Sequence, residues 1–353
     1  MRQPAHGGNL VWAAEHAGCP PSAILDFSAS ISPLGPPHSA LAAIESQLGH
    51  LRHYPDPDYR ELRLALGHCH QLPPEWILPG NGSAELLSLA GRELAQLAAT
   101  VLMTPAFGDY YRALDAYNAK VLEFPLSLVT GDLSSISDKR QKTKDKGLLL
   151  NNPHNPTGKL FSREAIVPYL EKFALVVVDE AFMDFLPQDQ EQSLIKIVQN
   201  HPNLVILRSL TKFYSLPGLR LGYAITHPDR LQQWQKWRDP WPVNTLAAAA
   251  AIAVLQDKKF QEQTWLWLPP AREHLFKGLA SVSGLQPLHS AANFLLVESQ
   301  QSSLQLQQKL LQHHQIFIRD CLSFPELGDR YFRVAVRSSS DHQRLLEALK
   351  IIV

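Results

Sequence analysis

Short apolar runs alternate with amphipathic stretches along most of the chain, beginning at about Pro73. The runs lie at 100–105, 120–124, 147–152, 174–180, 203–209 and 221–225. Several are apolar throughout, which is typical of strands buried on both faces of a parallel sheet. The stretches between them, such as 83–97 and 162–173, have helical spacing of apolar residues. The alternation predicts a layered α/β domain, with a mostly parallel sheet and helices on both faces.

The two ends of the chain follow other patterns. A helical stretch over 245–280 leads into shorter segments that predict a smaller α+β unit, at 293–297, 303–314, 316–320, 331–336 and 341–350. Residues 1–45 are rich in Pro, Ser and Gly, with a helical stretch around 10–17. We therefore predict an N-terminal arm (1–45), a large α/β domain (46–244) and a small C-terminal domain (245–353). The polar segment 127–147 predicts a surface excursion.

Composition narrows the class of protein. Among 353 residues, Lys and Arg number 33, as do Asp and Glu, so the formal net charge is +0. This balance argues against broad electrostatic binding to nucleic acid or anionic lipid. The three cysteines form neither a C-x-x-C pair nor a zinc pattern, so we expect no disulfide framework and no metal. The first residues lack a signal-peptide pattern. The apolar stretch 246–255 is too short to span a bilayer. We therefore expect a cytoplasmic protein without a membrane partner.

Candidate chemistry is expected where apolar runs end, because ligands of open parallel sheets bind at the carboxyl ends of strands. The segment PGNGSAELL (79–87) leads from glycines into an amphipathic helix, whose free N–H groups would suit a phosphate. The alternative is a plain turn with Ser83 as the helix N-cap. The spacing matches neither G-x-G-x-x-G nor the P-loop, so nucleotide binding by either loop is poorly supported.

Two charged residues follow buried runs. Asp179 ends the run ALVVVDE, where a carboxylate is costly unless it pairs with a cation such as magnesium or a protonated ring nitrogen. Lys212 follows another run, where an amine with a depressed pKa can act as a nucleophile. Thr211 and Arg220 nearby would suit a phosphate. The bland alternatives are an ordinary strand-end aspartate and a solvated lysine.

Other candidates are weaker when taken singly. Asn155 could donate to a ligand oxygen, or simply belong to a rigid turn. Phe107 or Tyr110 could stack on a planar ring, or pack in the core. Arginines in two late apolar runs could clamp a carboxylate or phosphate, or form surface salt bridges, namely Arg319, Arg333 and Arg337. Together these candidates match what pyridoxal 5′-phosphate (PLP) needs when it is held as a Schiff base. It needs a phosphate-binding turn, an aromatic ring to stack on, an aspartate, an amine and arginines that bind anions.

At this point a family resemblance adds to the residues. The motifs NPHNPTG (152–158), DEAF (179–182), SLTK (209–212) and GLRLG (218–222) resemble, in order and spacing, those of fold-type I PLP enzymes of the histidinol-phosphate aminotransferase branch. The resemblance covers nearly the whole chain. It implies an α/β fold of the PLP-dependent transferase (aspartate aminotransferase-like) type.

Within that branch, the chain is more similar to the L-threonine-O-3-phosphate decarboxylases of cobalamin biosynthesis. The similar stretches are 6–18, 24–37, 80–87 and 331–349. Phe182 also resembles the decarboxylases. The aminotransferases commonly have a tyrosine at this position, which helps to hold the cofactor 3′-oxygen. Ser32 departs from the pattern, which usually has asparagine, and so does His154.

The resemblance implies a role for each matching residue. Lys212 would bind PLP covalently and Asp179 would keep its pyridine nitrogen protonated, and these two would be catalytic. The implied cofactor-binding set is Tyr54, Gly82, Ser83, Ala84, Phe107, Asn155, Asp179, Ser209, Thr211, Lys212 and Arg220. Tyr54 would reach the cofactor phosphate of the neighbouring subunit in a homodimer. Arg333 would clamp a substrate anion, with Arg319 and His6 close by.

The implied activity is that of a lyase, which decarboxylates L-threonine O-3-phosphate to (R)-1-amino-2-propanol O-2-phosphate in cobalamin biosynthesis. The main alternative keeps the fold and cofactor but acts as an aminotransferase on histidinol phosphate or a related amino acid. A third reading is a non-catalytic binding protein that keeps an α/β shell. It is disfavoured because neither a DNA-binding helical module nor a basic stripe is visible.

Overall fold

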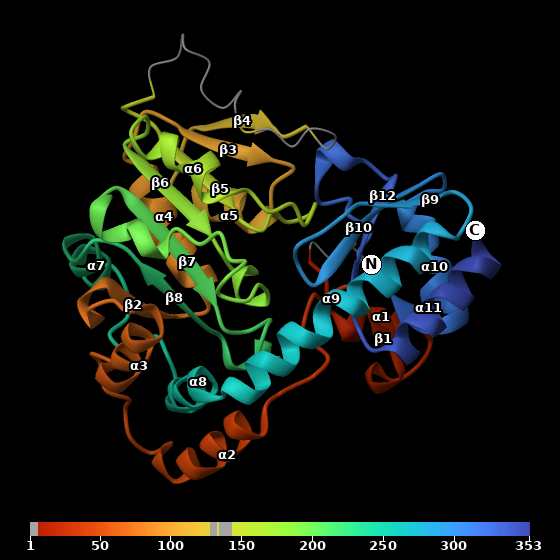
Figure 1. Ribbon diagram of the computed structural model, residues 1–353, viewed down its shortest axis with the longest axis horizontal. Coiled ribbons are helices and arrows are strands. Elements are labelled where there is room, and N and C mark those ends of the chain that lie inside the picture. The colour runs from red at the N-terminus through yellow and green to blue at the C-terminus, as the bar shows by residue number, and fades with distance from the viewer. Residues whose placement is uncertain (1–5, 128–132, 134–142) are drawn as a thin grey trace.

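A computed structural model describes residues 6–127, 133 and 143–353 of the chain, and the predicted excursion over 127–147 lies largely outside them. Its larger part, on the left of Figure 1, is built on a seven-stranded sheet. In spatial order the strands are β2 (Ile77–Asn81), β8 (Leu221–Ile225), β7 (Leu204–Ser209), β6 (Leu175–Asp179), β5 (Gly147–Asn151), β3 (Thr100–Thr104) and β4 (Val121–Pro125).

The sheet is mostly parallel, which confirms the prediction. Strands β7, β6, β5, β3 and β4 run parallel, with Asn151 opposite Asp179 and Asp179 opposite Leu207. Strand β8 is antiparallel to both neighbours. It returns from β7 without a long crossover helix, as antiparallel neighbours allow. The apolar pattern missed β2, because its sequence ILPGN carries a proline and a glycine, and Pro79 is tolerated there because β2 is an edge strand.

Helices cover both faces of this sheet, as predicted. One face packs against α4 (Ser83–Leu94), α5 (Gly108–Asp115) and α7 (Pro228–Gln235). The other packs against α3 (Arg60–His70), α6 (Arg163–Leu170) and α8 (Thr245–Gln256). Alternate residues of one strand serve the two faces: Val177 lies in the first apolar cluster, and Val176 and Val178 lie in the second.

The smaller part, on the right of Figure 1, has an antiparallel sheet of β9 (Leu285–Pro287), β10 (Phe294–Ser299) and β12 (Tyr331–Ala335). Its helices are α10 (Ser303–His314) and α11 (Ser339–Ile352). The predicted helical stretch 245–280 is two helices, α8 and the long α9 (Lys258–Ala280), and α9 connects the two parts of the molecule (Figure 1).

The N-terminal segment contacts both parts. It contains α1 (Leu10–Ala17), as predicted, then β1 (Leu25–Asp26), which pairs with β11 (Ile316–Phe317) in parallel, and α2 (His38–Gln47). Between β1 and α2, the backbone N–H of Ser32 donates to the carbonyl of Lys212, and Asn293 Nδ2 donates to the carbonyl of Ser30. Helix α2 packs against α8 across the predicted boundaries at 45 and 244, which stay predictions.

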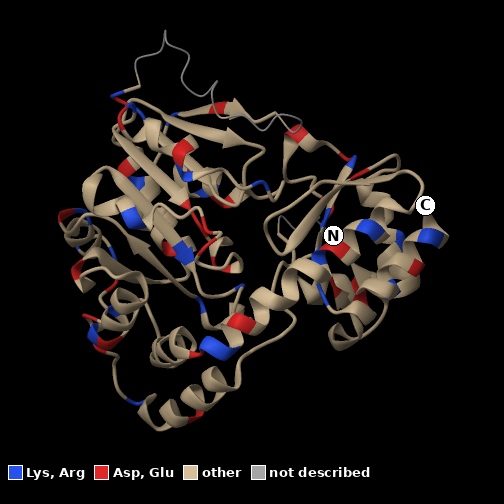
Figure 2. Cartoon of the chain, in the orientation of Figure 1, with Lys and Arg blue, Asp and Glu red and all other residues tan. Residues whose placement is uncertain are grey.

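Short 3₁₀ turns join the main elements. They lie at Pro21–Ala23, Leu48–His50, Pro74–Trp76, Met183–Phe185, Ile195–Asn200, Pro217–Leu219 and Pro325–Leu327. Basic and acidic residues are interspersed over both parts of the molecule in the view of Figure 2. Within the described residues, every helix is too short or too polar to cross a bilayer. Nor do His, Cys, Asp and Glu side chains of the described segments gather into a group that could hold a metal ion.

Candidate active site

A cavity of about 200 Å³ lies where the carboxyl ends of the strands, the N-terminal segment and the small sheet meet. The parallel register brings the ends of β5, β6 and β7 to one edge, and the chain after each strand contributes to the wall. The predicted site residues that line this cavity are His6, Ser83, Phe107, Asn155, Asp179, Lys212, Arg319 and Arg333. The fold therefore gathers residues that are scattered over most of the sequence.

Asp179 is the last residue of β6, and its carboxylate is held in place by two donors. The Tyr110 hydroxyl donates to Oδ2 at 2.9 Å and the Ala181 backbone N–H donates to Oδ1 at 2.9 Å. Burial raises the pKa of Asp179, and the Lys212 ammonium opposes that shift. A buried carboxylate beside an open cavity is suited to a cationic group of a ligand, such as a protonated ring nitrogen.

Lys212 follows β7 and points its amine into the cavity. Its Nζ lies 3.5 Å from Ser209 Oγ and 5.1 Å from the centre of the Phe182 ring. Burial lowers the pKa of Lys212, and the nearby Arg220 and Arg333 guanidinium groups lower it further, against the opposing effect of Asp179. A lysine in this environment is a candidate nucleophile, because only its neutral amine attacks a carbonyl carbon.

The turn before α4 forms a small cup. Gly82 has φ +75° and is the helix N-cap, so the alternative in which Ser83 caps the helix is wrong. A Cβ at Gly82 would lie 2.6 Å from Arg220 Nη2, and a Cβ at Gly222 would lie 2.5 Å from the Ser83 nitrogen. Free N–H groups of the first turn, which includes Ala84, and the Arg220 guanidinium are thus placed for a phosphate.

Two further hydroxyls lie beside Lys212, and an aromatic ring lines the cavity. Ser209 Oγ and Thr211 Oγ1 are 2.7 Å apart, directly before Lys212. Phe107 lines the cavity, and its ring centre lies 5.4 Å from that of His6. Tyr110 meets Phe107 edge-on, and its hydroxyl binds Asp179, so positioning the carboxylate is what Tyr110 does in this structure.

Two arginines from the smaller part of the molecule also line the cavity, Arg333 on β12 and Arg319 after β11. The backbones of Arg319 and Arg333 exchange hydrogen bonds of 3.0 and 2.7 Å, which sets the two side chains next to each other. Both are buried, so the surface salt-bridge alternative is wrong for them. Arg333 Nη1 donates to Asn155 Oδ1 at 2.5 Å, and Arg319 Nη2 donates to Ser323 Oγ. Burial lowers the pKa of Arg333 to about 10, which still leaves it charged at neutral pH.

Arg337 does not line the cavity, although it directly follows the segment 331–336 that contains Arg333. Its Nε donates to Asp341 at 3.1 Å, and its Nη1 donates to the carbonyl of Asp26 at 3.0 Å. It therefore ties β1 to α11 and does not line the cavity. Ser32 is also outside the lining, since its backbone contacts Lys212 and Ser215 from behind.

Sequence reasoning missed the cavity residues of the N-terminal segment, Ser28 and Ser30. Ser28 Oγ accepts from the Gly8 N–H at 2.8 Å, whereas Ser30 Oγ is buried and has no hydrogen-bond partner within the described part of the chain. The sequence offered little sign of these two serines because most of 24–37 is irregular backbone. Such a segment has no repeating pattern that predicts which side chains face inward.

Six implied cofactor residues are outside the lining of this cavity: Gly82, Ala84, Ser209, Thr211, Arg220 and Tyr54. The first five are next to lining residues or to one another, whereas Tyr54 lies apart from them. Its side chain is 79% exposed and stacks on Trp241, with 4.5 Å between ring centres. Among the described residues it does not belong to the lining, so its action on a neighbouring subunit stays a prediction.

Comparison with known proteins agrees with this geometry. A family model described as "Aminotransferase class I and II" matches residues 22–352. A threonine-phosphate decarboxylase of Salmonella typhimurium is 38% identical over 99% of this chain and 96% of its own length. A histidinol-phosphate aminotransferase of Symbiobacterium thermophilum is 34% identical, over 90% of this chain and 88% of its own.

A solved structure is also similar. The histidinol-phosphate aminotransferase of Sinorhizobium meliloti, crystallised in complex with pyridoxal 5′-phosphate, superposes with a TM-score of 0.85 at 25% identity, covering 98% of this chain and 94% of that one.

Proposed function

The chain belongs to the aminotransferase class I and II family, whose members use pyridoxal 5′-phosphate, and from this premise we propose that it is a lyase that decarboxylates L-threonine O-3-phosphate. The product would be (R)-1-amino-2-propanol O-2-phosphate, in cobalamin biosynthesis. The observation that carries the proposal is the pair of buried guanidinium groups in one cavity, because this substrate has two anionic groups, a carboxylate and a phosphate. The 38% identity to a threonine-phosphate decarboxylase supports it.

The residues of the cavity fit PLP. A Cβ at Gly82 would fill the cup beside Arg220, so this backbone is shaped for a close ligand such as the cofactor phosphate. Asp179 offers a buried carboxylate for the pyridine nitrogen, Phe107 a ring to stack on, and Lys212 an amine for covalent attachment. Asn155 would donate its amide N–H to the cofactor 3′-oxygen, because its Oδ1 already accepts from Arg333.

When bound, PLP supplies an electron sink that accepts the pair of electrons left when a bond to Cα breaks. The protein decides which bond that is. Arg333 and Arg319 would each hold one substrate anion, which fixes the rotation of Cα above the cofactor. The choice between losing the carboxylate and losing the Cα proton is therefore set by how these two side chains orient the substrate.

Lys212 is the residue that would transfer the proton to Cα. Burial and the neighbouring guanidinium groups lower its pKa, so its amine gives up a proton more readily than that of an exposed lysine. In the proposed reaction, Nζ delivers a proton to Cα after carbon dioxide has left. Asp179, held by Tyr110 and the Ala181 N–H, would keep the ring nitrogen of bound PLP protonated.

Phe182 also favours the lyase over the aminotransferase. Its ring lies under Lys212 Nζ and is packed edge-on against Phe294 at 5.0 Å between centres. A phenyl ring cannot donate a hydrogen bond, so the cofactor 3′-oxygen would rely on Asn155 alone. The aminotransferase is the second candidate, because histidinol-phosphate aminotransferases are nearly as similar in sequence.

The test is substrate profiling of the PLP-loaded enzyme. L-threonine O-3-phosphate should release carbon dioxide in stoichiometric amounts and yield the phosphorylated amino alcohol. Histidinol phosphate should give no pyridoxamine phosphate. Formation of pyridoxamine phosphate from histidinol phosphate, without carbon dioxide from phosphothreonine, would replace the lyase by the aminotransferase.

A further inference from the structure

A second cavity, of about 270 Å³, lies on the other side of the strands that carry Lys212 and Asp179. Its walls come from five segments: the end of α3 (69–71), the stretch after β6 (184–196), the stretch 208–214, Tyr223 of β8 and the junction of α8 with α9 (255–265). None of the residues assigned above to cofactor or substrate lines it. It has more room than the active-site cavity, and the proposed reaction makes no use of it.

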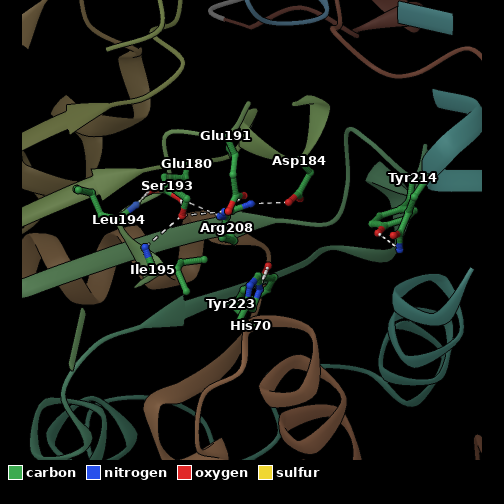
Figure 3. A network of polar contacts seen from close by, with 12 residues as sticks. His70, Glu180, Asp184, Glu191, Ser193, Leu194, Ile195, Arg208, Tyr214 and Tyr223 are labelled. Carbon is green, nitrogen blue, oxygen red and sulfur yellow. Dashed lines mark hydrogen bonds and ion pairs between the residues drawn. The ribbon is translucent and has the colours of Figure 1, made fainter. Parts of the chain in front are cut away.

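The floor of this second cavity is Arg208, surrounded by acceptors (Figure 3). Its Nε donates to Glu180 Oε2 at 2.9 Å, its Nη1 to Asp184 Oδ1 at 2.5 Å and its Nη2 to Ser193 Oγ at 3.0 Å, and Glu191 lies 3.8 Å away. The guanidinium is therefore already neutralised by carboxylates and has little attraction left for an anion. The neighbouring His70 adds no positive charge, because burial lowers its pKa to about 3.

One carboxylate oxygen in this wall lacks a donor. Asp184 Oδ2 is buried and has no hydrogen-bond partner among residues 6–127, 133 and 143–353. Buried polar atoms in native proteins are nearly always partnered, so a donor from a ligand or from water is expected here. Phe213, Tyr214 and Trp265 line the same cavity, and aromatic faces attract an ammonium group.

The open side of the second cavity has the opposite charge. Lys196 and Lys258 both line it and are exposed, so they lie where it meets solvent. Lys258 is held in position by Gln261, whose Oε1 accepts from its Nζ at 3.3 Å. The cavity thus offers an acceptor inside, apolar rings around it and ammonium groups at the rim.

We propose that this second cavity is a binding site for a small zwitterionic amino compound. The ligand's ammonium would donate to Asp184 Oδ2, and its anionic group would meet Lys258 and Lys196. Its carbon atoms would pack against the aromatic side chains. A volume of about 270 Å³ is ample for such a molecule, since one water position needs only about 10–15 Å³.

Binding would be felt in the active site, because both cavities share short segments of chain. Phe213 and Tyr214 directly follow Lys212, and Asp184 comes two residues after Phe182. A ligand that holds these walls also holds the backbone that positions the Lys212 amine. This makes the second cavity a candidate regulatory site of the enzyme.

The test uses L-proline and sarcosine on the PLP-loaded enzyme, with binding measured by isothermal titration calorimetry. Both are zwitterions with a secondary ammonium, which forms no stable imine with the cofactor aldehyde, so neither is captured covalently in the active site. We expect saturable binding of at least one of them, and expect it to persist in Lys212→Ala. Asp184→Asn should weaken binding about tenfold or more, as expected for loss of a charge-assisted hydrogen bond.

Lys258→Ala serves as a second variant on the surface, where folding is not at risk, and should also weaken binding. Its matched control is Lys259→Ala, because Lys259 is exposed, adjacent and outside the cavity lining. Absence of binding by both probes would overturn the proposal and leave a water-filled cavity. Binding that is lost in Lys212→Ala but kept in Asp184→Asn and Lys258→Ala would also overturn it, because the probe would then occupy the active site.

Discussion

At the scale of single residues, Asp179 shows how a polar side chain acquires its role from its surroundings. Its carboxylate is buried, oriented by Tyr110 and the Ala181 N–H, and 2.9 Å from each donor. The same residue on an exposed strand end would be an ordinary aspartate. The following two predictions concern residues whose roles depend on such placement.

Asp179→Asn should lower kcat by about 10² or more, because an amide cannot keep a ring nitrogen protonated, and general acid–base groups contribute on this scale. The measurement is steady-state carbon dioxide release. Tyr110→Phe, which removes only the orienting hydroxyl, should give a smaller loss. Equal activity of Asp179→Asn and the wild type would contradict the assignment of Asp179.

Arg333→Gln should raise KM for phosphothreonine by about 10²-fold or more, because it removes one partner of a buried charge pair with the substrate anion. Arg337→Gln is the matched control. Arg337 directly follows the segment 331–336 that contains Arg333, but it binds Asp341 and the Asp26 carbonyl. The assignment fails if both variants change KM to the same extent.

At the scale of elements, the cup before α4 depends on backbone geometry that the sequence only suggests. From the sequence, Ser83 could either contact a phosphate or cap the helix α4. In the structure the N-cap of α4 is Gly82, with φ +75°. Which residue caps the helix is decided by how β2 enters α4 beside Arg220 and Gly222. Neighbours from a distant part of the chain made that choice, so no local pattern could supply it.

Gly82→Ala should weaken PLP binding strongly and lower the free energy of unfolding by about 1 kcal/mol, because a side chain at positive φ is strained. The added Cβ would also lie 2.6 Å from Arg220 Nη2. Cofactor affinity is measured by absorbance titration, and stability by urea unfolding of the cofactor-free protein. Gly49→Ala is the control, because its Cβ would meet no atom within 4 Å, and it should change neither quantity.

At the scale of the whole molecule, three histidines with lowered pKa values link stability to pH: His70, described above, and the buried His154 and His342. Burial lowers the pKa of His154 to about 3 and that of His342 to about 4, against about 6.5 in an unfolded chain. Below pH 6.5 the unfolded chain takes up protons that the folded protein does not. Their contribution to stability is therefore complete above pH 6.5 and is lost as the pH falls toward 4.

We expect the free energy of unfolding to fall between pH 6.5 and 5, by up to about 1.4 kcal/mol per pH unit for each histidine. Urea unfolding of the cofactor-free protein at a series of pH values measures this slope. His154→Gln should make the slope shallower. An unchanged slope in that variant would show that His154 does not contribute to it.

A homodimer is the remaining prediction at this scale, and Tyr54 tests it. Its ring is 79% exposed and lies away from the cavity of its own chain, as a residue that serves a partner would. Tyr54→Phe should weaken PLP binding about tenfold, by loss of one hydrogen bond to a charged phosphate. Mixing Tyr54→Phe with Lys212→Ala should produce hybrid dimers that contain one active site intact in both residues. Activity that never exceeds the two variants measured separately would count against the shared site.

The sequence by itself determined most of the elements, the family and the cofactor that the family uses. Apolar runs without polar interruptions specify buried strands, and polar residues after them specify where a ligand binds, because both depend on local order along the chain. The motifs around Asn155, Asp179, Lys212 and Arg220 fixed the family for the same reason. Only the tertiary structure decided which of these residues meet: it buried Arg319 and Arg333 in the cavity, left Arg337 outside, and brought Ser30 in. It also formed the second cavity around Arg208. These outcomes depend on packing between segments far apart in sequence, and the geometry of such contacts exists only once the chain has folded.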